Sequence, residues 1–247
     1  MSTKPDLRAL RVLPYVTAAM IVITHLAAVA LCILAIRMVV HSDTQAYNFI
    51  GIFISYSTSI KFIIVIAMFV CLYRLSGITK WFFYSWICCI VYIVASLFTQ
   101  IVAWLSTITG ENIAVSSISF ILSLFPDASV LFAVYALLRG AEDIFIHIDK
   151  MDGRREASRA GNLWVFVETA LLSSYYLLFI VCALGLKLFK FGKGETPVVL
   201  AAPAYVFTVF LGLSIIAYVF AGVKVTGTVR RTCYEYYLYN YNSGVGL

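Results

Sequence analysis

Charged residues are scarce in this chain. Asp, Glu, Lys and Arg make up 12% of its 247 residues, whereas hydrophobic residues make up 62%. Soluble domains carry charge on roughly one-quarter of their residues. The composition therefore excludes an ordinary soluble domain and predicts an integral membrane protein, with no linker that would separate a second globular module.

The chain also lacks the patterns of several functional classes. It contains no N-x-S/T sequon and neither of the hydrolase motifs G-x-S-x-G and H-E-x-x-H. Of its three histidines, one lies inside an apolar run, which argues against a haem held by two histidines. Five of the six cysteines also lie inside apolar runs, so no framework of extramembrane disulfides is expected. The sequence thus predicts neither a cofactor nor a metal site, and a function without catalysis is favoured.

Long apolar runs dominate what is present. A helix needs about 20 apolar residues to cross the hydrocarbon core of a bilayer. Six runs meet this length, at about 14–40, 47–73, 81–106, 113–138, 163–189 and 197–223. The sequence therefore predicts an all-α, six-helix transmembrane bundle. The remaining segments are an N-terminal segment 1–13, a cytoplasmic loop 139–162 and a Tyr-rich cytoplasmic tail 224–247.

The basic residues predict the orientation of this bundle, because Lys and Arg are enriched in cytoplasmic loops. One side would hold Lys4, Arg8, Arg11, Arg74, Lys80, Arg139, Lys150, Arg154, Arg155, Arg159, Lys224, Arg230 and Arg231. The other side would hold Arg37, Lys187, Lys190 and Lys193. Both termini are therefore predicted to be cytoplasmic. The net charge of +6 is attributed to contacts with anionic lipid headgroups, and nucleic acid is not an expected partner.

The loop 139–162 contains a partial motif, DKMDGRREASRAG. Asp149, Asp152 and Gly153 are similar to the opening of the motif of CDP-alcohol phosphotransferases, in which carboxylates hold metal ions. The Ala-Arg pair of that motif is displaced here, and the segment that follows supplies Glu168 where two more aspartates are needed. One or two carboxylates cannot neutralise two metal ions on a pyrophosphate. A solvated loop of mixed charge is therefore the favoured interpretation.

Three ionisable residues fall near the middle of three different runs: His25, Lys61 and Asp127. A charged side chain at the centre of a bilayer costs about 2.5–3.5 kcal/mol on insertion scales, so it should have a partner or a task. The sequence predicts an intramembrane polar site in which Lys61 pairs with Asp127 near His25. Pro126 would free a carbonyl oxygen beside Asp127. The candidate supporting residues are Ser57, Ser123, Gln100, Glu168 and Tyr175.

Two functions from different classes follow from these residues. The first is a small transporter or channel-like protein that uses His25, Lys61 and Asp127 for ion pairing or protonation. In the second, the three residues are a structural clasp, and the chain is a membrane organiser or assembly subunit within a homo- or hetero-oligomer. The Tyr-rich tail would then bind a cytoplasmic partner. Cys233 follows two arginines in this tail, and it is either a candidate for palmitoylation or an exposed cysteine.

Overall fold

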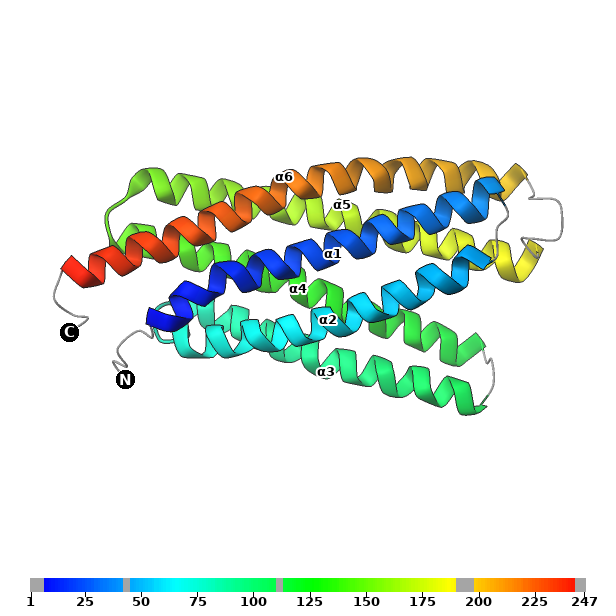
Figure 1. Ribbon diagram of the computed structural model, residues 1–247, viewed down its shortest axis with the longest axis horizontal. Coiled ribbons are helices and arrows are strands. Elements are labelled where there is room, and N and C mark those ends of the chain that lie inside the picture. Colours follow the sequence, from blue (N-terminus) through cyan, green and yellow to red (C-terminus); the bar gives the residue numbers. More distant parts are fainter. Residues whose placement is uncertain (1–6, 42–44, 110–112, 190–197, 243–247) are drawn as a thin grey trace. The chain divides into compact units, whose positions relative to one another are not determined.

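The computed structural model describes residues 7–41, 45–109, 113–189 and 198–242, and this part of the chain consists of six helices with short connections and no strand (Figure 1). The prediction of an all-α protein is confirmed. The helices are α1 (Leu7–His41), α2 (Gln45–Leu75), α3 (Lys80–Thr109), α4 (Ile113–His147), α5 (Met151–Phe189) and α6 (Val198–Asn242).

Five of these helices contain stretches that are long and apolar enough to cross a membrane. Among the residues described, the stretches are Arg8–Leu34, Tyr56–Leu75, Lys80–Val102, Ile121–His147 and Pro203–Asn242. This architecture fits an integral multi-pass membrane protein. The apolar part of α5 runs into residues 181–189, whose side chains lie outside the described set. The sixth span and the cytoplasmic orientation of the termini therefore stay predictions.

The segment 139–162, which the sequence assigns to a loop, is mostly helical. α4 continues to His147 and α5 begins at Met151, so a short turn joins them. Asp149 adopts φ 56° in this turn, and the Lys150 amide donates a hydrogen bond to the Phe145 carbonyl oxygen at 2.9 Å. These are the features of a Schellman motif, which usually has glycine at the left-handed position. Because Asp149 occupies that position, the sequence carries no glycine to mark the end of the helix.

The chain divides into two compact units, which are described separately. Unit 1 comprises Met1–Ala19, Phe62–Val165 and Val223–Leu247. Unit 2 comprises Met20–Lys61 and Phe166–Gly222. Unit 1 thus holds all of α3 and α4 and one end of each other helix. Unit 2 holds the remaining parts of α1, α2, α5 and α6.

Close backbone approach and buried hydrogen bonds hold the helices of unit 1 together. Ser85 Oγ of α3 donates a hydrogen bond to the Ala133 carbonyl oxygen of α4 at 2.7 Å. The indole of Trp164, which is buried in α5, donates to the Leu131 carbonyl oxygen at 3.3 Å. Gly140 of α4 packs on the ring of Phe82, and a Cβ at Gly140 would lie 2.4 Å from two ring carbons.

Gly140→Ala is therefore expected to lower the free energy of unfolding by about 1–3 kcal/mol, the usual cost of overpacking a core. Gly212→Ala is the matched control, because a Cβ at Gly212 would meet nothing within 4 Å. Alanine is a better helix former than glycine by about 1 kcal/mol, so the control should be neutral or stabilising. Thermal unfolding in detergent measures both. Equal stability of the two variants would contradict the tight α3–α4 packing.

Ion pairs gather at one end of unit 1, where the last turns of α6 meet the α4–α5 turn. Glu156 of α5 pairs with Arg231 of α6 at 2.5 Å, and Lys150 pairs with Glu235. The Arg11 guanidinium of α1 donates to the Tyr237 hydroxyl at 3.3 Å and lies 5.2 Å from the centroid of its ring. Residues 224–242 of the predicted tail are therefore helical and belong to the packed structure of this unit.

Candidate functional site

The centre of the candidate site is the contact between His25 and Tyr218 in unit 2. The two rings are stacked, with centroids 6.1 Å apart and an interplanar angle of 9°. One turn away on each helix, Gly222 allows Ile21 to approach, since a Cβ at Gly222 would lie 2.6 Å from Ile21 Cγ2. His25 Nδ1 is buried and makes no hydrogen bond within the described residues. The stack thus orients an imidazole that still has a nitrogen available for a proton.

Glu168 is the most deeply buried carboxylate of the predicted site. Its side chain is 1% exposed, although α5 is apolar on both sides of it. Glu168 lies shortly after residue 163, where its span is predicted to begin. Tyr218 lies equally far from residue 223, where the span of α6 is predicted to end. The carboxylate and the ring that stacks on His25 therefore lie at similar depths by sequence.

Lys61 is a further predicted site residue of unit 2 with an ionisable side chain. It lies half-buried on α2, and the buried side chain of Ser57 precedes it by one turn. Tyr175, also in unit 2, is half-buried and makes an edge-to-face contact with Tyr176, with centroids 5.1 Å apart. Unit 2 thus holds His25, Lys61 and Glu168, together with two of the predicted supporting residues.

The other predicted residues, Asp127, Ser123 and Gln100, belong to unit 1. Asp127 is half-buried and follows Pro126 in α4, which continues through the proline without a break. Gln100 is exposed on α3. Because Lys61 and Asp127 belong to different units, their pairing stays a prediction.

Hydroxyl groups in these helices mostly bond to their own backbone. Ser129 Oγ donates to the Phe125 carbonyl oxygen at 2.6 Å, and Thr24 and Ser174 do the same four residues back along their helices. Such bonds satisfy a hydroxyl without a partner on another helix. The hydroxyl of Ser129, which lies two residues after Asp127, is therefore satisfied within α4.

The structure corrects the expectation of an exposed Cys233. This cysteine lies inside α6 and is 7% exposed. Acylation requires an accessible sulfur atom and is favoured by a thiolate. Lipidation of Cys233 would therefore require the end of α6 to separate from unit 1.

Among the described residues, the carboxylates of the partial phosphotransferase motif are not grouped with enough other ligands to hold a metal ion. Asp149 and Asp152 are exposed around the α4–α5 turn. Over the ranges that the structure describes, no three His, Cys, Asp or Glu side chains are grouped so that they could hold a metal ion. Two metal ions on a pyrophosphate would need several converging carboxylates, so this geometry gives the enzymatic interpretation no support.

Tyr218 is the residue of the site that sequence reasoning missed. The sequence contains 16 tyrosines, and one in the last apolar run has no feature that distinguishes it from a packing residue. A usable signal was the spacing of Tyr218 and Gly222, which lie one turn apart on the same face of α6. A small residue next to an aromatic one marks a face on which another helix can approach closely.

The fold and these residues define a class of protein: a multi-pass helical membrane protein with ionisable side chains inside its apolar helices. No family model matches the chain, and neither does any curated protein or solved structure.

Proposed function

We propose that the chain transports protons, or a cation in exchange for protons, across its membrane through the ionisable residues of unit 2. The observation that carries this proposal is the burial of Glu168 in the same unit as His25 and Lys61. Ionisable residues inside membrane helices are rare because they are costly, and they commonly mark ion pathways and proton relays.

The three side chains have complementary chemistry for this task. Histidine has an unperturbed pKa of about 6.5, so it can gain and lose a proton at physiological pH. Stacking on Tyr218 fixes the imidazole plane of His25 and leaves Nδ1 as a proton acceptor. A carboxylic acid in apolar surroundings can hold a proton, and a cation close to it favours its release. Lys61, which belongs to the same unit as Glu168, is the proposed cation. Glu168 and His25 are accordingly proposed as the groups that exchange protons.

His25→Phe is expected to reduce proton uptake into proteoliposomes to the level of protein-free liposomes. Phenylalanine keeps a flat ring that can stack on Tyr218, but it cannot carry a proton. His147→Phe is the matched control, because His147 is exposed at the end of α4. Uptake is measured with an entrapped pH-sensitive dye under an imposed membrane potential. Wild-type uptake no faster than that of empty liposomes, or normal uptake by His25→Phe, would contradict the proposal.

The second candidate function is that of a membrane organiser, and the packing of residues 224–242 favours it. The pairs Lys150–Glu235 and Glu156–Arg231, together with the Arg11–Tyr237 contact, fix this helix against α1 and α5. An organiser could use the exposed tyrosines of this end as a rigid surface. This function predicts no proton uptake by the wild type, and an assembly in detergent that is lost when residues after Arg231 are removed.

A further inference from the structure

Four basic side chains near the α4–α5 turn have acidic partners. Arg139 and Arg154 both pair with Glu142, at 2.7 Å and 3.5 Å. Lys150 pairs with Glu235, and Arg231 pairs with Glu156. Glu142, Glu156 and Glu235 are thereby engaged, so a basic residue that lies near them but outside these pairs retains its charge for another partner.

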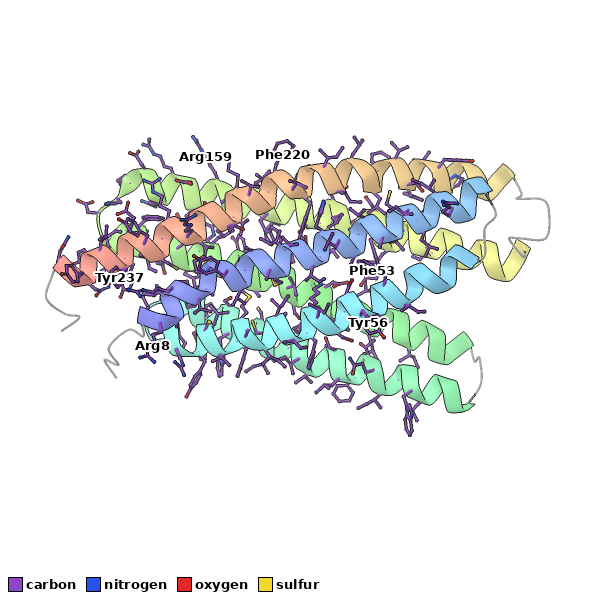
Figure 2. The ribbon with its side chains drawn as sticks, in the orientation of Figure 1. Arg8, Phe53, Tyr56, Arg159, Phe220 and Tyr237 are labelled. Atoms are coloured by element: carbon purple, nitrogen blue, oxygen red, sulfur yellow. The ribbon has the colours of Figure 1, made fainter. Side chains whose placement is uncertain are left out.

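Four basic side chains next to these pairs are exposed and have no ion-pair partner in the described parts of the chain: Arg155, Arg159, Lys224 and Arg230. The pairs Lys150–Glu235 and Glu156–Arg231 show that α5 and α6 run antiparallel here. Arg159 follows Glu156 by almost one turn, and Lys224 precedes Arg231 by about two turns. In antiparallel helices these two positions lie in the same direction along the helix axes from the Glu156–Arg231 pair, with Arg159 on α5 and Lys224 on α6. Figure 2 shows Arg159 projecting outward from α5.

Gly227 lies between Lys224 and Arg231 on the same face of α6, and it is exposed. A Cβ at this position would meet no atom within 4 Å, so helix packing does not require glycine there. Glycine is a poor helix former compared with alanine. It leaves bare backbone beside Lys224, onto which a bulky ligand can fit. We call Arg155, Arg159, Lys224 and Gly227 the α5–α6 rim.

The α5–α6 rim lies at the predicted membrane boundary. Arg159 comes shortly before the span predicted at 163–189, and Lys224 directly follows the span predicted at 197–223. Long basic side chains at such positions reach the level of lipid headgroups, where an anionic lipid surface attracts them.

We propose that the α5–α6 rim binds the headgroup of an anionic phospholipid, with the phosphate held between Arg159 and Lys224. Arg155 adds to the positive charge at the outer end of the rim, and Gly227 leaves space for the headgroup. A membrane lipid is the proposed occupant because the rim faces outward at the boundary and its charge complements a phosphodiester. This binding does not depend on the proposed transport, and its test requires no flux.

The test uses the full-length protein in a neutral detergent, with dioctanoyl phosphatidylserine as the probe and dioctanoyl phosphatidylcholine as the neutral comparison. Native mass spectrometry or thermophoresis gives the dissociation constant. Arg159→Gln and Lys224→Gln are each expected to weaken binding of the serine lipid about fivefold, from the known attraction of single basic residues to anionic membranes. Gly227→Leu should also weaken it, without a change of charge.

Arg230→Gln is the matched control. It removes the same charge from an exposed residue of α6, but Arg230 faces a different side of the helix from Lys224 and Arg231. Its affinity for the serine lipid should equal that of the wild type. A loss at Arg230→Gln as large as at Lys224→Gln would overturn the proposal in favour of attraction by total charge. Equal binding of the two lipids, or full displacement of the serine lipid by inorganic phosphate, would also overturn it.

Discussion

Phe145→Ala should lower the free energy of unfolding by about 3–5 kcal/mol, the usual cost of removing a fully buried aromatic side chain. Phe145 lies near the end of α4, is 0% exposed and packs between Ala141 and Ala157. The guanidinium of Arg231 lies 5.8 Å from the centroid of its ring. Removal of the ring would therefore loosen α4, α5 and α6 where they meet. Chemical or thermal unfolding in detergent measures the loss.

Ile146→Ala is the control for this prediction. Ile146 is the next residue of α4 but is exposed, and exposed substitutions usually change stability by less than about 0.5 kcal/mol. Gly153 provides a second check, because a Cβ there would lie 2.4 Å from two ring carbons of Phe145. Gly153→Ala should destabilise the wild type but cost much less in the Phe145→Ala background. Additive losses would show that the ring does not pack on Gly153.

Glu168→Gln should reduce proton uptake into proteoliposomes about 100-fold, a typical size for the loss of one positioned proton-transfer group. Glutamine keeps the volume and the hydrogen-bonding capacity of the side chain, so the fold should survive, but it cannot exchange a proton. Glu235→Gln is the matched control, since Glu235 pairs with Lys150 at the charged end of unit 1. Normal uptake by Glu168→Gln, with a folded protein, would leave Glu168 with a structural role.

The helices could be predicted from the length of the apolar runs, but their ends could not. α4 and α5 extend past the predicted membrane boundaries. The turn between them has Asp149 in a left-handed conformation and contains no glycine or proline, so nothing in the sequence marks where α4 ends. The helical end of α6 was missed for another reason. Its buried residues Val225, Val229 and Thr232 recur at helical spacing, but the many tyrosines and polar residues around them indicated an exposed tail.

The polar site was predictable in part. The cost of a charge in an apolar run drew attention to His25, Lys61 and Asp127, and the structure puts the first two in unit 2. The position of a residue along a helix gives its depth but not the direction in which its side chain points. For this reason neither the burial of Glu168 nor the contact of Tyr218 with His25 could be deduced from one sequence. The pairing of Lys61 with Asp127 stays a prediction because the two residues belong to different units.

Carbodiimide labelling of the wild-type protein in proteoliposomes is the sharpest test of proton exchange at Glu168. Dicyclohexylcarbodiimide reacts with protonated carboxyl groups in apolar surroundings, and peptide mass spectrometry locates and quantifies the label. Glu168 is expected to be labelled, and proton uptake is expected to fall in proportion to the labelled fraction. Undiminished uptake after complete labelling of Glu168 would contradict proton exchange at this residue.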